Sequence, residues 1–278
     1  MAGEKETVGI IGVGRMGLAM LKHMVAAGHT VFARDIDAAQ LAEARKAGAT
    51  VADTPAEIGK QATFVIVIPV TDEQVNEVLL GKSGLIETVR PGTIVAVSST
   101  VSPATVQALD ETFRAKGADV LDAPLCRGRQ YADAGTLLAL VGGKPEVVAR
   151  GRAVYGTFCS DIAHLGAVGH GQVGKAMNNM LLWINSIGLI EAGQLAATTG
   201  IDLPTLREAL QMSSGKSQAL EDWDHTTFTF ALKDMQIVSQ MADKAGLAMP
   251  MAGAVREMVK EAKRLKATNP PPWTGKKA

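Results

Sequence analysis

The 278-residue sequence predicts an α/β domain with a doubly wound, largely parallel sheet, followed by an all-α domain. Short apolar runs alternate with helical stretches in the first part, and a glycine-rich turn joins the first predicted strand to the first predicted helix. After about Gly174 the apolar residues recur only at helical spacing. We therefore expect one domain over residues 1–165 and a second over residues 166–278, joined by a long helix.

The strands of the first domain are predicted from apolar runs bounded by turn residues, over Thr7–Gly12, Thr30–Ala33, Ala62–Ile68, Thr93–Val97, Asp119–Leu121 and Leu137–Val141. Continuous runs such as ATFVIVI are typical of central parallel strands, because both faces of such strands are buried. Helices are predicted between them, over Arg15–Ala27, Ala38–Ala47 and Pro103–Lys116. Right-handed crossovers then place helices on both faces of the sheet.

The second domain is predicted to be helical throughout. A proline-free apolar pattern predicts one long helix over Lys175–Thr199, followed by helices over Leu203–Met212, Leu232–Ala245 and Met249–Leu265. Gly200 and Gly246 lie where helix C-caps are expected. The last segment, NPPPWTGKKA, cannot continue a helix, and we expect it to be exposed or mobile.

The composition excludes several classes of protein. Lys and Arg number 28 and Asp and Glu number 28, and this neutral balance argues against a nucleic-acid binder. Two cysteines without a CxxC pair indicate neither a disulfide framework nor a zinc site, and the five histidines lack metal-ligand spacing. The first residues lack a signal-peptide pattern, and no apolar run approaches the length of a membrane span. We therefore expect a cytoplasmic protein without a metal or membrane partner.

A glycine fingerprint, G-x-G-x-x-G, follows the first predicted strand and opens the first predicted helix. In this context Gly12 permits a tight turn, Gly14 lets the backbone approach a pyrophosphate, and Gly17 lets the helix pack on the strand. The helix N-terminus then presents free N–H groups to the phosphates. The fingerprint predicts a Rossmann-type dinucleotide site that includes Arg15 and Met16.

An acidic residue at the end of the second strand completes the fingerprint. Asp35 lies 21 residues after Gly14, where its carboxylate can accept hydrogen bonds from the ribose hydroxyls of NAD. A 2′-phosphate at this place would meet a like charge. Asp37 is a second acidic candidate, and the neighbouring Arg34 leaves NADP open. The pattern favours NAD over NADP.

Other strands should carry further cofactor contacts where they end. These positions are Ile68 and Pro69 after one strand, and Ser99 and Thr100 after another. Ser99 and Thr100 have an alternative role, which is to cap the helix that begins near Pro103.

Five segments together carry a resemblance to a known family: GIIGVGRMGLAM (9–20), VSSTVSP (97–103), DAPLCRG (122–128), GHGQVGKAMNNML (169–181) and LKDMQ (232–236). They are similar to the β-hydroxyacid dehydrogenases, which include 3-hydroxyisobutyrate dehydrogenase, tartronate semialdehyde reductase and the glyoxylate/succinic semialdehyde reductases. The resemblance implies a homodimer or homotetramer that reversibly oxidises a short 3-hydroxy acid to its semialdehyde. It further implies that Lys175 is the catalytic lysine, that Asn179 supports it, that Lys233 closes over the cofactor, and that Thr100 lies near nicotinamide and substrate.

The chemistry of Lys175 and Asn179 agrees with these roles. The two residues are four apart and share one face of the predicted long helix. An ammonium aimed at the substrate oxygen stabilises an alkoxide, and the amine form can take its proton. For an isolated lysine the usual alternative is a solvated surface charge.

The substrate loop departs from the family pattern. The family usually has DAPVSGG where this chain has DAPLCRG, so Cys126 and Arg127 replace a serine and a glycine before Gly128. The resemblance assigns substrate binding to Thr100, Cys126, Arg127, Gly128, Lys175 and Asn179. Arg127 either pairs with an anionic group of the substrate, or points to solvent while Cys126 fills space.

Three alternatives stay open beside an NAD-dependent 3-hydroxyacid dehydrogenase. The first is an NADP-dependent semialdehyde reductase acting on tartronate or succinic semialdehyde or on glyoxylate. The second is an imine reductase, although such enzymes generally lack a lysine at the position of Lys175. The third is a nucleotide-binding protein without catalysis, which the presence of both Lys175 and Asn179 disfavours.

Overall fold

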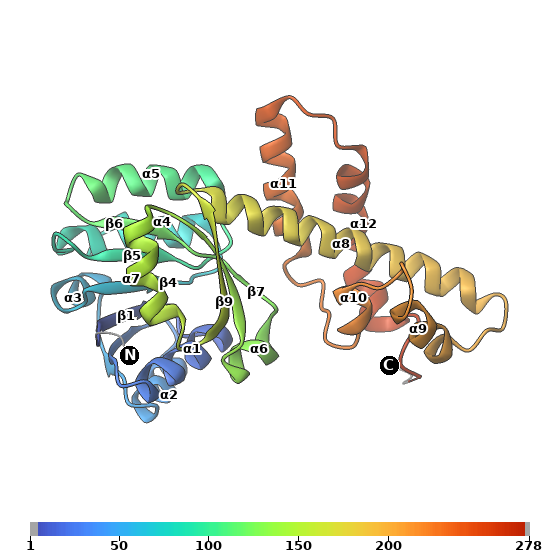
Figure 1. Ribbon diagram of the computed structural model, residues 1–278, viewed down its shortest axis with the longest axis horizontal. Helices are drawn as coiled ribbons and strands as arrows, with labels where there is room; N and C mark the ends of the chain where they lie inside the picture. The colour runs from blue at the N-terminus through green and yellow to red at the C-terminus, as the bar shows by residue number, and fades with distance from the viewer. Residues whose placement is uncertain (1–4, 276–278) are drawn as a thin grey trace. The chain divides into compact units, whose positions relative to one another are not determined.

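A computed structural model of the protein describes residues 5–275 (Figure 1). Its internal contacts divide the chain into two units, one ending at Lys175 and the other beginning at Ala176. The first unit is an α/β structure and the second is helical. The predicted fold class is therefore confirmed.

One sheet forms the centre of the first unit. Its strands are β1 (Thr7–Ile11), β2 (Thr30–Arg34), β3 (Thr50–Val51), β4 (Phe64–Val67), β5 (Ile94–Val97), β6 (Asp119–Asp122), β7 (Leu125–Cys126), β8 (Leu137–Gly142) and β9 (Cys159–Gly166). The order is β3-β2-β1-β4-β5-β6-β8-β7, and β9 pairs with β8. β1 to β6 run parallel, whereas β8 is antiparallel to β6 and β7. Because the strand order reverses between β1 and β4, their carboxyl ends form the crevice where such sheets bind ligands.

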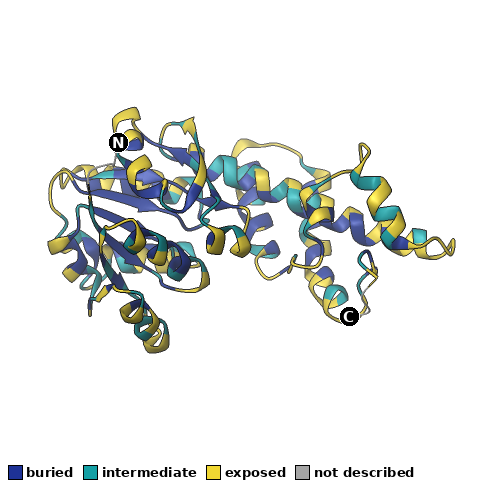
Figure 2. Ribbon diagram, turned by 60° about the horizontal axis from the view of Figure 1, so that its bottom comes forward, coloured by how far each residue is buried: buried dark blue, intermediate teal, exposed yellow. Residues whose placement is uncertain are grey.

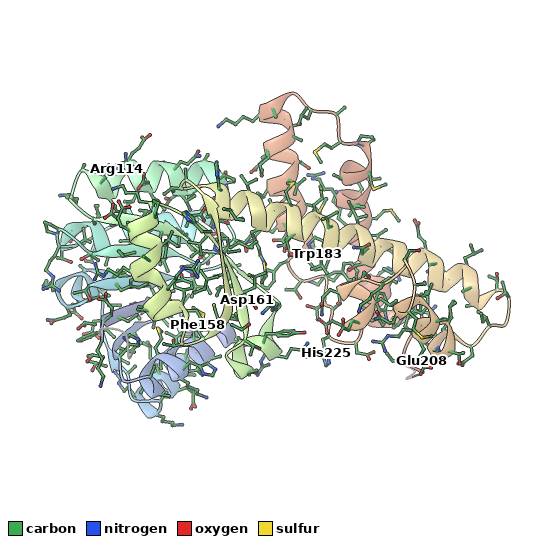
Figure 3. All side chains as sticks on the ribbon, viewed as in Figure 1. Arg114, Phe158, Asp161, Trp183, Glu208 and His225 are labelled. Carbon is green, nitrogen blue, oxygen red and sulfur yellow. The ribbon has the colours of Figure 1, made fainter. Side chains whose placement is uncertain are left out.

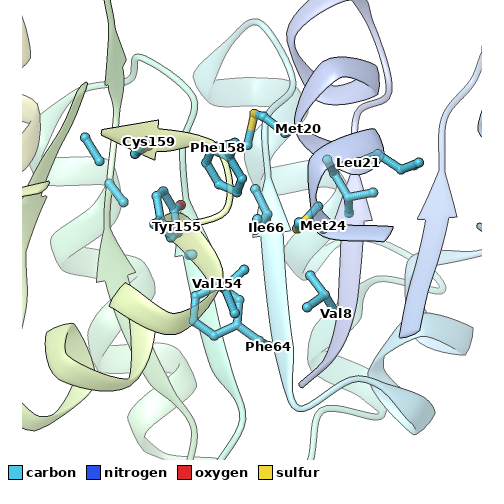
Figure 4. Packing of buried hydrophobic residues seen from close by; sticks show 14 of the residues in the cluster. Val8, Met20, Leu21, Met24, Phe64, Ile66, Val154, Tyr155, Phe158 and Cys159 are labelled. Carbon is cyan, nitrogen blue, oxygen red and sulfur yellow. The ribbon is translucent and has the colours of Figure 1, made fainter. Parts of the chain in front are cut away.

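Alternate residues of each central strand enter two separate cores. Phe64 and Ile66 of β4 pack with α1 (Arg15–Ala26), α2 (Ala38–Lys46) and α7 (Pro145–Tyr155), and Figure 4 shows part of this cluster. Val65 and Val67 pack on the opposite face, with α3 (Pro55–Gln61), α4 (Asp72–Leu80) and α5 (Pro103–Arg114). The strands are accordingly buried while the outer faces of the helices are exposed (Figure 2). The sheet is covered on both faces, as a doubly wound fold requires.

Several elements were not predicted from the sequence. They are β3, β7, β9, α3, α4, α6 (Arg129–Ala134), α7, α10 (Gln218–Glu221) and the 3-10 turn at Leu85–Glu87. For α4 a usable signal exists, because Thr71 and Gln74 form a capping box at its N-terminus. The other elements are too short or too mixed in pattern for periodicity alone to identify them.

The helices of the second unit are α8 (His170–Ala197, which begins in the first unit), α9 (Leu203–Gln211), α10 (Gln218–Glu221), α11 (Ala231–Ala245) and α12 (Pro250–Thr268). Trp183, Trp223, Phe228 and Met235 are central to its core. Gly246 ends α11 in the left-handed conformation, as expected of a C-cap glycine.

Helix α8 is long and apolar enough to cross a membrane, judged by length and composition alone. The expectation that no segment approaches such a length is therefore wrong for α8. However, 33% of its most apolar window is buried. Trp183, Ile187 and Ile190 on this helix belong to the helical core. The part of α8 that carries these three residues therefore contributes to the core of the second unit.

The C-terminal segment was expected to be exposed or mobile, and Asn269, Pro272 and Gly275 are exposed, but Pro271 and Trp273 are buried. Trp273 is fully buried, and its Nε1 donates a hydrogen bond to the Leu189 carbonyl at 3.1 Å. At Gly193 of α8 an added Cβ would lie 2.5 Å from Pro271 Cβ and 3.1 Å from the Trp273 ring. Gly193, which has low helix propensity, therefore leaves the space that the tail fills.

Candidate active site

The three fingerprint glycines meet different surroundings. Gly12 has a φ of +100°, and an added Cβ would lie 2.9 Å from the Ile68 carbonyl oxygen. An added Cβ at Gly17 would overlap the Gly12 carbonyl oxygen. At Gly14 no atom of the described residues lies within 4 Å of an added Cβ. Gly12 and Gly17 thus serve the turn and the helix packing, while Gly14 leaves open space above the loop.

The N-terminus of α1 is available to an anion. Gly14 is the N-cap, and within residues 5–275 no side chain makes a capping hydrogen bond to this helix end. Gly14 and Arg15 are exposed, and Met16 packs partly against the core. Unpaired N–H groups and the helix dipole favour a phosphate at such an end. These features fit a dinucleotide.

Asp35 lies directly against the fingerprint loop. Its Oδ2 accepts a hydrogen bond from Val13 N at 2.5 Å, and its Oδ1 accepts one from Asp37 N at 2.9 Å. The Arg34 guanidinium donates to the Asp35 carbonyl oxygen. The Asp37 side chain instead caps α2. The two acidic candidates therefore have different roles, since Asp35 contacts the fingerprint loop whereas Asp37 caps α2.

The loops after β4 and β5 are joined to each other. Ser99 Oγ donates to the Pro69 carbonyl oxygen at 2.6 Å. Ile68, the residue before Pro69, directly follows the last residue of β4. Thr100 follows Ser99 and is half-buried. The N-cap of α5 is Ser102, so the capping role considered for Ser99 and Thr100 belongs to Ser102.

Lys175 reaches the substrate loop from α8. Its Nζ donates to the Leu125 carbonyl oxygen at 2.6 Å and lies 3.8 Å from Cys126 Sγ. Cys126 is only 4% exposed. Asn179 follows one helical turn later, is buried, and accepts a hydrogen bond from Asn178 Nδ2 at 3.1 Å. The structure thus brings Lys175 and Cys126 together, as expected of a shared site.

Arg127 is exposed and Cys126 is buried, as one of the two expectations for this loop has it, but the Arg127 guanidinium is also bonded to the protein. Its guanidinium donates to the Thr136 carbonyl oxygen at 2.9 Å and to Ser160 Oγ at 2.8 Å. It also pairs at 2.7 Å with Asp161 of β9, which Figure 3 labels. Hydrogen bonds from Ser160 and Arg127 lower the pKa of Asp161. Arg127 has a φ of +86°, in the region that favours glycine, and Gly128 follows at +85°. Arg127 therefore ties a strained loop to β8 and β9.

Two buried polar residues that the sequence patterns do not single out are Asp122, at the end of β6, and Gln172, in the first turn of α8. Asp122 is fully buried, and its Oδ2 accepts from Gly169 N at 2.9 Å and Gln172 N at 3.1 Å. Among the described residues its Oδ1 has no hydrogen-bond partner, and burial raises the pKa of Asp122 to about 7. Polar residues in otherwise apolar surroundings were the available signal.

Lys233 lies in the first turn of α11 and is half-buried. The next residue, Asp234, is buried and accepts a hydrogen bond at 3.1 Å from Nε1 of Trp183, the α8 residue that Figure 3 labels. This bond fixes the start of α11 to α8 within the helical unit. The role of Lys233 toward the cofactor stays a prediction.

Comparison with known proteins agrees with this geometry. Residues 7–166 match the family described as the NAD binding domain of 6-phosphogluconate dehydrogenase. Residues 169–269 match the family described as NAD-binding of NADP-dependent 3-hydroxyisobutyrate dehydrogenase. The chain belongs to the β-hydroxyacid dehydrogenase family. The members of this family are NAD(P)-dependent oxidoreductases, so the resemblance seen in the sequence motifs is confirmed.

Individual β-hydroxyacid dehydrogenases are similar along most of the chain. A 3-hydroxyisobutyrate dehydrogenase of Pseudomonas aeruginosa is 36% identical over 213 residues, covering 77% of this chain and 72% of that protein. The human mitochondrial 3-hydroxyisobutyrate dehydrogenase is 34% identical over 212 residues, covering 76% of this chain and 63% of that protein. The match thus spans slightly less than two thirds of the mitochondrial relatives. The crystal structure of a 3-hydroxyisobutyrate dehydrogenase from Salmonella typhimurium has a TM-score of 0.83 at 25% identity and covers 95% of each chain.

Proposed function

We propose that this protein is an NAD-dependent dehydrogenase that interconverts a short 3-hydroxy acid and its semialdehyde. The observation that carries the proposal is the Lys175 ammonium, which lies 2.6 Å from the Leu125 carbonyl oxygen and beside Cys126. Membership of the β-hydroxyacid dehydrogenases supports the reaction class. The neighbouring Asn179 supplies an amide on the same face of α8.

The proposed reaction uses several groups of the first unit together with Asn179, which lies farther along α8. The fingerprint loop and the N-terminus of α1 would hold the pyrophosphate of the dinucleotide. When bound, the nicotinamide supplies or accepts a hydride at the substrate carbon. In oxidation, Lys175 as a free amine takes the hydroxyl proton of the substrate, and in reduction its ammonium returns a proton to the carbonyl oxygen. The Leu125 carbonyl fixes the direction of the Lys175 side chain, and the Asn179 amide orients the substrate oxygen.

The position of Asp35 supports NAD as the cofactor. Both carboxylate oxygens accept backbone N–H bonds, which hold the Asp35 side chain beside the fingerprint loop. A 2′-phosphate would meet this charge, whereas ribose hydroxyls can donate to it. Arg34, the residue that could hold a 2′-phosphate, donates to the Asp35 carbonyl oxygen. We expect kcat/KM to be at least about tenfold higher with NAD, a difference of about 1.4 kcal/mol, and an Asp35→Ser variant to lose that preference.

The substrate class can be tested directly with purified protein, NAD and a panel of 3-hydroxy acids. We expect NADH absorbance to rise with at least one of 3-hydroxyisobutyrate, glycerate and L-serine, because each places a hydroxyl two bonds from the carbon bearing the carboxylate. A 2-hydroxy acid such as lactate should give no signal. No turnover with any member of the panel, in either direction and with either cofactor, would overturn the proposal. The homo-oligomeric state and the cytoplasmic location remain predictions.

A further inference from the structure

Gln172, in the first turn of α8, holds a loop that lies some seventy residues earlier in the sequence. Its side chain is buried, with 1% of the residue exposed. Its Oε1 accepts a hydrogen bond from Val101 N at 3.1 Å, and its Nε2 donates to the Ser99 carbonyl oxygen at 2.9 Å. The two bonds enclose Thr100, which lies between these residues. The amide of one side chain thus satisfies one donor and one acceptor of the loop after β5.

The other end of this connection is the turn that carries Lys175. Gln172 precedes Lys175 by three residues, so the two side chains project from neighbouring turns on one side of α8. The backbone of this turn is itself fixed, because Asp122 Oδ2 at the end of β6 accepts from Gly169 N and Gln172 N. Lys175 is fixed in turn to the Leu125 carbonyl. All of these residues belong to the first unit.

The glutamine is the chemically required residue for this pair of bonds. A glutamate at the same place could still accept from Val101 N, but it would have no donor for the Ser99 carbonyl. A methionine of similar length could make neither bond and would leave two buried backbone groups unpaired. Anchoring of α8 alone does not require the glutamine side chain, because Asp122 already binds that turn through backbone N–H groups.

We propose that Gln172 is a positioning residue that sets the distance between Thr100 and Lys175. This inference rests on the proposed function, in which Thr100 lies near the nicotinamide and Lys175 moves the proton. Hydride and proton transfer act on adjacent atoms of one substrate, so both groups must keep a fixed separation. A misplacement of about 1 Å can cost about a hundredfold in rate. Gln172 supplies this constraint because its side chain bonds the loop at 99–101, while its backbone belongs to the part of α8 that carries Lys175.

The test compares Gln172→Met and Gln172→Glu with Gln107→Met. Gln107 is an exposed glutamine of α5 whose Nε2 donates to the Val168 carbonyl oxygen at 3.4 Å, so it contacts the segment before α8 without touching the loop at 99–101. We expect Gln172→Met to lower kcat at least about tenfold while the Kd for NAD changes less than about threefold. Gln172→Glu should lose at least as much as Gln172→Met, because it places a second buried carboxyl group beside Asp122 and facing the Ser99 carbonyl oxygen. Gln107→Met should match the wild type.

Two readouts separate positioning from a general loss of structure. The primary deuterium isotope effect on kcat should rise in Gln172→Met, because misplaced groups slow the chemical step and leave product release unchanged. Amide hydrogen exchange of residues 99–101 should accelerate about tenfold in Gln172→Met and stay unchanged in β1 and α1. A kcat within twofold of wild type, or a fall in kcat that only parallels a loss of NAD binding, would overturn the proposal. If the wild type has no dehydrogenase activity, the proposed function fails, and unchanged exchange at 99–101 would independently refute the connection.

Discussion

The same substitution at two fingerprint glycines should separate folding from cofactor binding. At Gly14 an alanine meets no described atom within 4 Å, and φ is −63°, which alanine adopts readily. We expect Gly14→Ala to change the free energy of unfolding by less than about 1 kcal/mol, since lost unfolded-state entropy and poorer N-capping oppose each other. At Gly17 the new methyl group would overlap the Gly12 carbonyl oxygen. Overpacking against backbone then costs about 3 kcal/mol or more.

Gly14→Ala should weaken cofactor binding even though it changes stability little. Its added methyl group stands on the exposed helix end where the pyrophosphate is expected, so NAD should bind at least about tenfold more weakly, or about 1.4 kcal/mol. Urea denaturation measures the first quantity, and isothermal titration calorimetry with NAD measures the second. A Gly14→Ala protein of wild-type stability and wild-type NAD affinity would refute the assignment of the phosphate site. A stable Gly17→Ala protein would refute the packing argument.

Three further predictions follow from buried or strained residues. Burial raises the Asp122 pKa from 3.8 to about 7, so its neutral form stabilises the fold below pH 3.8, and this stability is lost as pH rises through about 7. Relative to Asp122→Asn, wild-type stability should therefore fall by about 4 kcal/mol between about pH 4 and pH 8, and a pH-independent difference in urea denaturation would contradict this. Arg127→Gly should change stability by less than about 1 kcal/mol, because a φ of +86° suits glycine and the lost ion pair with Asp161 is partly exposed. It should also keep kcat/KM within about threefold of wild type. A kcat/KM loss above tenfold would mean that Arg127 binds the substrate. Trp273→Ala should cost about 3–5 kcal/mol in urea denaturation, whereas a loss below about 1 kcal/mol would mean that the tail is exposed.

Features with a local cause were predictable from the sequence. The run ATFVIVI gives a central strand because each of its faces packs into a separate core, as Phe64 and Val65 show. The fingerprint glycines and Asp35 could be placed because a βαβ unit fixes their spacing, and the structure brings them to one edge of the sheet. Lys175 and Asn179 could be placed on one helix face because residues four apart lie one above the other on a helix.

Features that depend on distant partners could not be predicted. Arg127 pairs with Asp161, 34 positions later in the chain, and only the register of β8 with β9 brings the two together. The expected alternatives for Arg127 were substrate and solvent, and they did not include this ion pair, although Arg127 is exposed. Trp273 follows three prolines, and these correctly predict that no helix continues there. They do not reveal that Gly193 leaves space in which the tail can pack. Asp122 and Gln172 act through backbone groups, which side-chain patterns do not reveal.

Chemical rescue can test the claim that Lys175 moves the proton during hydride transfer. NADH formation by Lys175→Ala should be slower than wild type by about a thousandfold at saturating NAD and 3-hydroxy acid, with the Kd for NAD nearly unchanged. A small primary amine such as ethylamine, added to the assay, should raise the rate of Lys175→Ala at least about tenfold. It should not raise the rate of the wild type. A Lys175→Ala enzyme that keeps more than a tenth of wild-type kcat would contradict the claim.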